Sequence, residues 1–215
     1  MSRLFLVCAL TACLGAAAIS LTFAQSGPSL SRRVTFAAIA RDGFAPPPPP
    51  AAPVDNGPIV SVYLGSGAVL ATSPVERRDT RFESGQEYFE NPTAPHFIVH
   101  YPRFGVPGRP GANTILAAHV NYLGFGPGPF ASIAAARIGD TLTLAMSDGT
   151  AYTFTVQSVD IIPLSIIDMD AVVFPALAST RERATLISCG GTCIPNGAGC
   201  DYDSRVVLVA ERFLD

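Results

Sequence analysis

A hairpin signal near the middle of the chain limits the fold more than any other local feature. Two runs rich in β-forming residues, Thr141–Met146 and 152–159, flank the dipeptide Asp148-Gly149. Asp-Gly is a pair of residues that suits a tight turn between two antiparallel strands. The sequence therefore predicts a β-hairpin across these residues.

Other β-rich runs extend this interpretation to the rest of the chain from residue 58 onward. They cover 59–64, 95–101, 113–120, 184–189 and 205–213, and Gly- and Pro-rich loops separate them. An Ala-rich piece at 129–137 suits a turn or two of helix. Many short strands with little helix predict an all-β sandwich or barrel, formed by one domain over residues 58–215.

The charge pattern excludes several classes of function. The formal net charge is −3, all 14 basic residues are Arg, and no long basic run occurs. Nothing in this pattern points to nucleic acid or to an anionic lipid surface as a partner. The absence of Lys excludes chemistry that needs a lysine amine from this chain.

Residues 1–25 form an export segment. Arg3 precedes an uncharged apolar stretch, 4–24, that is about long enough to span a bilayer. Three interpretations stay open: a signal peptide cleaved after Ala24, an uncleaved signal anchor, and a lipoprotein box that acylates Cys13. Each of them exports the rest of the chain, so we expect the domain to work outside the cytoplasm, where disulfides persist.

Residues 26–57 connect the export segment to the β-rich domain. This linker contains a run of five prolines, 46–50, which favours polyproline II over helix or inner strand. It is either a stiff spacer or a plain disordered leader.

Three cysteines lie close together near the C-terminus, at Cys189, Cys193 and Cys200. Structural zinc sites need four ligands and usually show two close pairs, so this spacing disfavours a metal. A disulfide between Cys193 and Cys200 is the simplest interpretation, because the loop between them is rich in turn residues. Cys189 is then unpaired, at the end of a strand and before two glycines, where a reactive thiol would be open to a substrate.

A thiol nucleophile needs a proton acceptor, and the chain has three histidines. His96 and His100 are four apart in the run 95–101, which in a strand places both on one, partly buried, face. His119 instead lies where a strand runs into a Gly/Pro-rich loop, a good position for a catalytic base. The sequence favours His119 as the partner of Cys189.

Arg205 is the third candidate site residue. It opens the last strand pattern, where a fixed cation would stabilise the oxyanion that forms when a thiolate attacks a carbonyl. Its alternative is an ordinary solvated or ion-paired residue, with Asp201 and Asp203 as available partners. No acidic cluster supports a calcium site, and we expect neither a metal nor a cofactor.

These residues resemble a known family. "TLISC" resembles the Thr-Leu-x-Thr-Cys motif of sortases, with Ser188 in place of the second Thr. "ILAAHV" resembles the strand-end histidine motif of the same family, and "SRVVLVA" resembles the strand that its arginine opens. The segment between His119 and Cys189 is also similar to its counterpart in sortases, and the approach "PGRPGANTILAAH" is closest in character to classes D, E and F.

The resemblance implies a closed eight-stranded β-barrel with one or two short helices, and a cysteine transpeptidase on the extracytoplasmic face of a bacterial membrane. Such an enzyme cleaves a sorting signal of the Leu-Pro-x-Thr-Gly kind and holds the acyl chain as a thioester. It then transfers that chain to an amine of the cell wall or of a pilin. Carried over, Cys189 is the nucleophile, His119 the acid and base, and Arg205 the oxyanion or positioning residue. Its partners are proteins with a C-terminal sorting signal, an amine acceptor and, if the N-terminal segment is uncleaved, the membrane.

One departure from the family pattern is the cysteine-containing insertion between Cys189 and Arg205. It leaves open how this side of the site recognises substrate, and pairing of Cys189 with Cys193 or Cys200 would inactivate the thiol. Two alternative functions also remain. An L,D-transpeptidase would have His and Arg much closer to its Cys. A non-catalytic, disulfide-stapled β-domain that binds at the cell surface would have Cys189 bonded or buried, far from His119.

Overall fold

A computed structural model describes residues 56–65, 73–84, 86–122, 124, 126–196 and 199–214. The predicted export segment and all but the last two residues of the predicted linker lie outside the described residues. No helix within the described part of the chain combines the length and the apolar character needed to cross a membrane.

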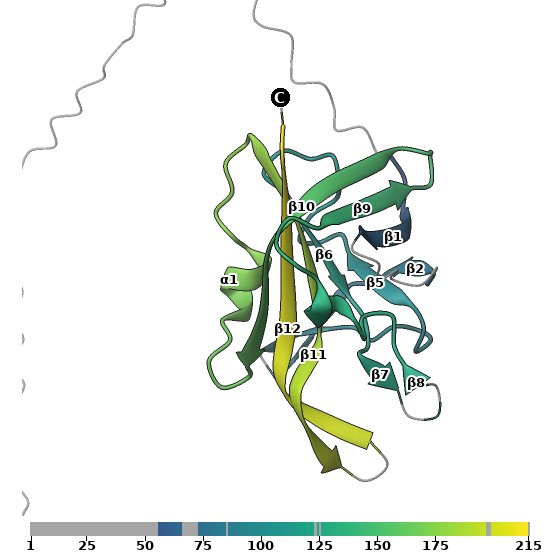
Figure 1. Ribbon diagram of the computed structural model, residues 1–215, viewed down its shortest axis with the longest axis vertical. Helices are drawn as coiled ribbons and strands as arrows, with labels where there is room; N and C mark the ends of the chain where they lie inside the picture. The colour runs from purple at the N-terminus through teal and green to yellow at the C-terminus, as the bar shows by residue number, and fades with distance from the viewer. Residues whose placement is uncertain are drawn as a thin grey trace, which may run out of the picture. The chain divides into compact units, whose positions relative to one another are not determined.

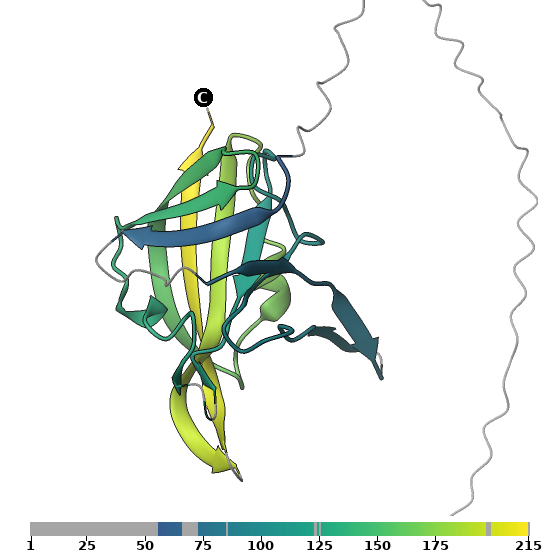
Figure 2. The same ribbon diagram turned by 90° about the vertical axis from the view of Figure 1, so that its right-hand side faces the viewer.

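One eight-stranded sheet makes up most of the domain (Figures 1 and 2). Its strand order is β1-β9-β10-β12-β11-β6-β5-β2, and the edge strands β1 and β2 contact each other, so the sheet nearly closes into a barrel. The strands are β1 (Ile59–Gly65), β2 (Val75–Arg77), β5 (Ile98–Tyr101), β6 (Asn113–Ala117), β9 (Thr141–Met146), β10 (Ala151–Pro163), β11 (Arg181–Asn196) and β12 (Gly199–Phe213).

Four shorter strands and two single-turn helices complete the domain. β3 (Thr80–Glu83) pairs with β4 (Gln86–Phe89), and β7 (Asn121–Tyr122) pairs with β8 (Gly126–Pro127). The helices are a 3-10 turn, η1 (Ile133–Ala135), and α1 (Met169–Val173), whose first turn is capped by the Asp168 carboxylate. The predicted all-β barrel with one or two short helices is confirmed.

The predicted hairpin is formed by β9 and β10. Gly149 takes a φ of 91°, the left-handed conformation that glycine adopts without steric cost. The Asp148 carboxylate accepts a hydrogen bond from the Thr150 amide at 2.8 Å and stabilises the turn. The strands continue the antiparallel pairing, with Tyr152 opposite Leu144.

Side chains alternate between the two faces of the barrel wall, as strand geometry requires. Leu116 of β6, Leu186 of β11 and Leu208 of β12 are fully buried in the main core. A smaller apolar cluster includes Ile115 and Ile187, the neighbours of two of these leucines, together with α1 residues such as Val173. The odd-numbered residues at the ends of β6 and β11 therefore belong to the outer face, beneath α1.

β11 and β12 pair well beyond the main sheet and form an arm, defined here as residues 190–204. Figure 2 shows this arm projecting past one end of the barrel. Cys193 lies opposite Tyr202 and Pro195 opposite Cys200, so the cysteine-containing insertion is a continuation of the two strands. The sequence prediction of strands confined to 184–189 and 205–213 was too short.

Candidate active site

Cys189 and Arg205 face each other directly across the β11–β12 pair. Side chains of directly opposed residues lie on the same face of a sheet, with Cβ atoms about 4.5–5.5 Å apart. Val206, the neighbour of Arg205, belongs to the main core, so Arg205 and Cys189 belong to the outer face. The strand register alone thus brings together two residues separated by the whole arm.

His119 reaches the same place along a different strand. β6 runs parallel to β11, and their last pair is Ala117 with Ile187. The Ala118 amide then donates to the Ile187 carbonyl at 3.3 Å. His119 and Cys189 are each two residues beyond that last pair, His119 past the end of β6 and Cys189 still within β11, so the parallel register carries both to one end of the barrel.

The three predicted site residues line one cavity of about 160 Å³, here called the central cavity. Ser188 and Ala118 also border it. All three predicted residues are half-buried. Within the described part of the chain, Cys189 is the free cysteine, and no hydrogen bond joins its thiol to the His119 imidazole. The structure therefore places a free thiol, an imidazole and a guanidinium around one small space.

The loop after β6 holds His119 by its backbone. The Phe130 amide donates to the His119 carbonyl at 3.1 Å, and the Gly128 amide donates to the Val120 carbonyl at 2.9 Å. A Cβ on Gly128 would lie 2.2 Å from the His119 carbonyl oxygen, so only glycine lets the loop approach this closely. The imidazole packs beside the Tyr122 ring at a centroid distance of 5.1 Å.

Partial burial lowers the pKa of His119 below the ordinary value of a histidine. Its imidazole is therefore neutral at neutral pH. A neutral imidazole can accept a proton, which is the property that a base beside a thiol requires.

Arg205 is a cation without a carboxylate partner within the described residues. Its Nη1 donates to the Ser204 carbonyl at 3.0 Å, and none of the ion pairs of the described structure includes it. Asp201 instead accepts from Asn196, and Asp203 accepts from Thr192 and Ser204. No ion pair with Asp201 or Asp203 is formed, and the guanidinium is left without a carboxylate partner among the described residues.

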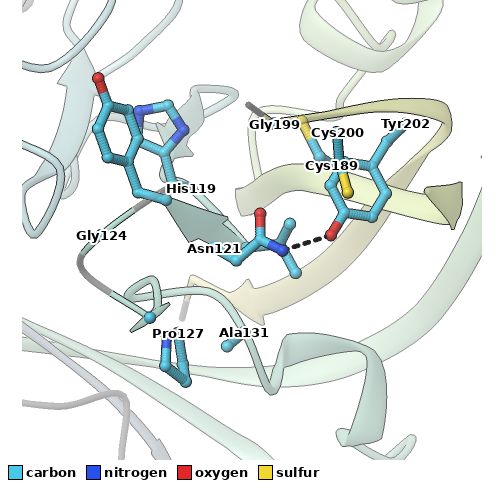
Figure 3. Close-up of a pocket in the computed structure, with 12 residues that line it drawn as sticks. His119, Asn121, Gly124, Pro127, Ala131, Cys189, Gly199, Cys200 and Tyr202 are labelled. Carbon is cyan, nitrogen blue, oxygen red and sulfur yellow. Dashed lines mark hydrogen bonds between the residues drawn. The ribbon is translucent and has the colours of Figure 1, made fainter. Parts of the chain in front are cut away.

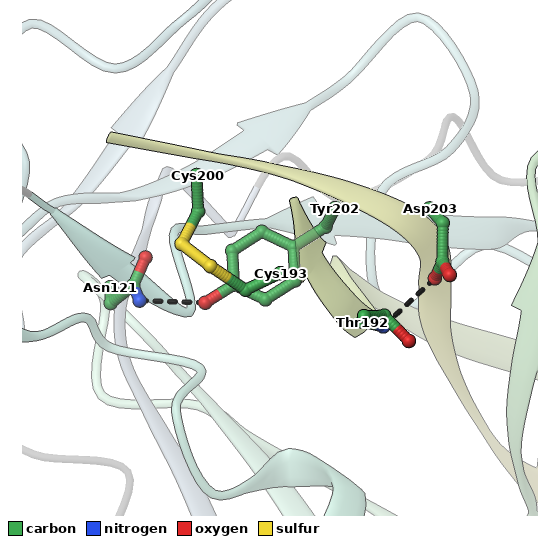
Figure 4. Close-up of a disulfide and its surroundings, with 6 residues drawn as sticks. All are labelled: Asn121, Thr192, Cys193, Cys200, Tyr202 and Asp203. Atoms are coloured by element: carbon green, nitrogen blue, oxygen red, sulfur yellow. Dashed lines mark hydrogen bonds between the residues drawn. A yellow bond between two sulfur atoms is a disulfide. The ribbon is translucent and has the colours of Figure 1, made fainter. Parts of the chain in front are cut away.

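The cysteine cluster resolves as the sequence suggested. Cys193 and Cys200 form a disulfide with a Cα–Cα distance of 5.2 Å (Figure 4). Cys189 is a free cysteine. Two of the three sulfurs are thus bonded to each other. Across the described residues, no group of three or more His, Cys, Asp or Glu side chains is arranged to hold a metal ion.

The expectation for the other two histidines was wrong. β5 begins only at Ile98, so His96 lies outside the strand and is exposed, and the two do not share a strand face. His100 is fully buried, and its Nε2 lies 3.0 Å from the Gly105 carbonyl as the donor to it. Neither residue borders the central cavity.

Two larger spaces flank the central cavity. The histidine-side groove, about 1030 Å³, is bordered by His119 and Cys189, by the β7–β8 hairpin and by the arm (Figure 3). The arginine-side pocket, about 280 Å³, is bordered by Arg205 and Ile187. Its apolar walls come mainly from β4, the loop after β5, and α1, and they include Tyr88, Phe89, Phe104, Met169, Val173 and Phe174. The polar residues Thr80, Gln86, Glu87 and Asp170 also border it.

Sequence reasoning missed both flanking walls. The aromatic residues of the arginine-side pocket come from β4 and from segments without a strand signal, and nothing in their spacing links them. Tyr202 and Asn121 were also missed, although the Asn121 Nδ2 donates to the Tyr202 hydroxyl at 2.6 Å across the histidine-side groove. Tyr202 directly precedes Asp203, Ser204 and Arg205, and nothing in this sequence pattern indicated that its side chain borders the groove.

Comparison with known proteins agrees with this geometry. The family model of the Sortase domain matches residues 78–213, more than half of the chain. No curated protein sequence gives a significant match.

Solved sortase structures resemble the chain in fold. The SrtA sortase from Actinomyces oris is 19% identical with a TM-score of 0.50, over 71% of this chain and 78% of that one. Sortase A from Corynebacterium diphtheriae is 14% identical with a TM-score of 0.47, over 74% of this chain and 62% of that one. Sortase C-1 from Actinomyces oris is 17% identical with a TM-score of 0.41, over 55% and 59%.

Proposed function

The chain belongs to the sortase family of cysteine transpeptidases, and from this we propose that it cleaves a C-terminal sorting signal through a thioester on Cys189. The observation that carries the proposal is the central cavity, where the free Cys189 thiol, His119 and Arg205 meet. A non-catalytic binding domain would not need a free thiol, a neutral imidazole and an unpaired guanidinium around one cavity. An L,D-transpeptidase is disfavoured by the same family match.

Acylation begins when the Cys189 proton passes to His119 and the thiolate attacks the scissile carbonyl carbon. The carbonyl oxygen becomes an oxyanion, which the Arg205 guanidinium stabilises with charge-assisted hydrogen bonds. The tetrahedral intermediate collapses when the C–N bond breaks. His119 returns its proton to the departing amine, and the acyl chain stays on Cys189 as a thioester.

Deacylation reverses these steps with a new amine. His119 accepts a proton from the incoming amine, whose nitrogen attacks the thioester carbonyl. Arg205 stabilises the second oxyanion, and the C–S bond breaks to release the Cys189 thiolate, which takes the proton back from His119. A new amide is formed, and no cofactor or external energy source is consumed.

The arginine-side pocket supports the choice of substrate. It is small and lined mainly by aromatic and aliphatic side chains, with Glu87 and Asp170 also on its border, and it shares Arg205, Phe89 and Ile187 with the central cavity. An apolar residue followed by proline, as in a Leu-Pro-x-Thr-Gly signal, suits such a pocket because it buries apolar surface without an unpaired charge. We propose that the acyl part of the sorting signal binds here, with the scissile carbonyl at Cys189.

The location follows from the chemistry of the substrate. A sorting-signal protein and its amine acceptor, in the cell wall or on a pilin, both occur outside the cytoplasm. We propose that residues 1–25 export the domain and that the anchored form works at the bacterial cell surface.

This function is tested by incubating the full chain with a panel of sorting-signal peptides and an amine acceptor. We expect cleavage and transfer for at least one Leu-Pro-x-Thr-Gly-like peptide, and loss of both in Cys189→Ala. The proposal is wrong if no peptide is cleaved, or if cleavage survives that substitution.

A further inference from the structure

The short helix α1 lies between two spaces on the outside of the barrel wall (Figure 1). Met169, Asp170 and Val173 border the arginine-side pocket on one flank. On the other flank, Ala171 and Val172 border a second space of about 320 Å³, over β10 and β12. Neighbouring side chains therefore do not wedge this single turn from both sides, and packing alone does not fix its position along the wall.

The side chain of Asn113 ties the end of α1 to the barrel. Its Nδ2 donates to the Val172 carbonyl at 3.0 Å and to the Val173 carbonyl at 3.2 Å. The last carbonyls of a helix have no partner within the helix, so these two bonds satisfy groups that α1 cannot satisfy itself. Asn113 belongs to β6 and is 3% exposed, so α1 is attached to a buried position of the sheet.

Thr185 fixes which way the Asn113 amide points. Its hydroxyl donates to the Asn113 Oδ1 at 2.8 Å, and both side chains are buried. Thr185 lies on β11, which pairs with β6 in parallel. The amide oxygen thus accepts from the strand side while the amide nitrogen donates to the helix side, so each polar atom of the group has a partner. A buried amide whose partners are all present holds a single orientation.

The link reaches the arginine-side pocket through the residue that follows α1. Phe174 borders this pocket, and its ring centroid lies 5.2 Å from that of Phe104, which in turn lies 5.6 Å from that of Phe89. The Val173 carbonyl that Asn113 holds belongs to the peptide bond leading into Phe174. Asn113 itself borders neither the arginine-side pocket nor the central cavity. Its effect on a substrate therefore passes through α1.

Resting on the proposed function, we propose that Asn113 is a positioning residue for the donor peptide. With Thr185 it fixes α1 on the barrel wall, and α1 holds Val173 and Phe174 as one wall of the pocket for the acyl part of the sorting signal. The reacting side chains are positioned separately, by the register of β6, β11 and β12. Loss of the link weakens donor binding and leaves the chemical step intact.

The kinetic test separates donor binding from chemistry in the full chain. The double variant Asn113→Leu, Thr185→Val removes the link and leaves neither side chain with an unpaired polar group. With triglycine as the amine acceptor, we expect the KM for a cleavable sorting-signal peptide to rise about 10-fold, as for the loss of one or two hydrogen bonds. The kcat and the KM for triglycine should stay within about 2-fold of the unchanged chain.

The single variant Asn113→Asp isolates the two bonds to α1. It keeps the shape of the side chain and the acceptor for Thr185, but it places a carboxylate oxygen against two carbonyl oxygens. We expect a rise in donor KM at least as large as in the double variant. Gln157→Leu is the matched control, because the Gln157 Nε2 also donates to a backbone carbonyl, that of Thr155 at 3.0 Å. Gln157 is exposed and borders neither the arginine-side pocket nor the central cavity, so its variant should keep the donor KM.

Methyl NMR measures the position of α1 without any donor. Met169 begins α1 and Met146 lies in the main core, so their methyl groups report on the helix and on the barrel. In Cys189→Ala, removal of the link should shift or broaden the Met169 signal and leave the Met146 signal in place. A sorting-signal peptide titrated into the same two chains should bind about 10-fold more weakly when the link is absent. If the Met146 signal moves too, the double variant has lost its fold, and Asn113→Asp takes its place.

Several outcomes count against the positioning role. An unchanged Met169 signal overturns it, as does a donor KM that stays constant or that rises equally in Gln157→Leu. A fall in kcat at constant donor KM would assign Asn113 to the chemical step and would also overturn it. If the unchanged chain cleaves no sorting-signal peptide, the proposed function fails, and the Met169 signal alone decides whether Asn113 fixes α1.

Discussion

Cys189 and Arg205 are direct partners across the antiparallel β11–β12 pair, on the outer face of the barrel. The thiol and the guanidinium are therefore positioned by the backbone register, with no side-chain contact needed to align them. This rigidity suits an oxyanion-stabilising cation, because its donors must be in place before charge develops.

Substitution of Arg205 should lower the rate of acylation and leave the fold intact. Removing one oxyanion donor typically costs about 10²–10³-fold in kcat, and we expect that loss in Arg205→Ala. Arg205→Lys keeps the charge but loses the planar donor fork, so it recovers only part of the rate. Steady-state cleavage of a donor peptide measures both, with the exposed Arg109→Ala as the control that retains full activity.

Gly128→Ala should displace His119 without touching the reacting atoms. The added Cβ would collide with the His119 carbonyl, so the loop must move and take the imidazole with it. We expect at least a 10-fold loss of kcat/KM, because small misplacements of a catalytic group are costly. Gly65→Ala is the control, because its added Cβ would lie 3.4 Å from its nearest neighbour, an ordinary contact. The measurement is kcat/KM for donor-peptide cleavage, which should fall in Gly128→Ala and stay unchanged in Gly65→Ala.

Buried His100 should make the domain less stable in acid. Burial lowers the pKa of His100 to about 4, and its Nδ1 has no hydrogen-bond partner in the described structure. Between pH 6.5 and 4 the unfolded chain binds a proton that the folded chain does not, so stability falls as the pH falls through this window. The loss from this residue is about 2–3 kcal/mol at pH 4.5.

Urea unfolding at pH 7 and pH 4.5 isolates that contribution. His100→Gln keeps a donor for the Gly105 carbonyl but does not titrate, so its stability should depend less on pH. His96→Gln, at the exposed histidine, should behave like the unchanged chain. An equal acid loss in the His100 variant and in the unchanged chain would refute the assignment.

The buried Glu182–Arg212 pair should carry far more stability than an exposed pair. The Glu182 carboxylate is 1% exposed and accepts from Arg212 Nε at 2.8 Å and from the Gly108 amide at 3.2 Å. Arg212→Ala leaves that carboxylate buried and unpaired, which costs about 3–5 kcal/mol. Arg81→Ala breaks the exposed pair with Glu83 and should cost less than about 1 kcal/mol in the same denaturation experiment.

Strands with strong local signals were predictable from the sequence, and strands that depend on tertiary contacts were not. The bounds predicted for β9 agree with the structure, because its alternation and the Asp-Gly turn are both local. The arm has a Gly-, Pro- and Asn-rich composition typical of a loop. It pairs as strands because β11 and β12 continue from the barrel and the Cys193–Cys200 disulfide crosslinks them.

The three residues that the sequence proposed for the site border one cavity, whereas the residues around them were not predictable from the sequence. His119 follows the end of β6, whereas Cys189 and Arg205 lie within β11 and β12, where the sequence pattern had predicted a strand end and a strand start. The face of the sheet on which these three side chains lie depends on which residues of each strand point into the core. The run around Leu186 and Ile187 is apolar throughout, so the sequence does not show which of these two residues faces the main core. The walls from Phe104, Phe174 and Tyr202 come from segments far apart in sequence and meet only in the fold.

Mass spectrometry of the full chain mixed with a sorting-signal peptide tests the proposed chemistry at its reacting atom. We predict an adduct whose mass equals the acyl part of the peptide, located on Cys189 and released by triglycine. The adduct should be absent in Cys189→Ala and should form slowly in Arg205→Ala. Peptide cleavage without any adduct on Cys189, or an adduct that persists in Cys189→Ala, would contradict the mechanism.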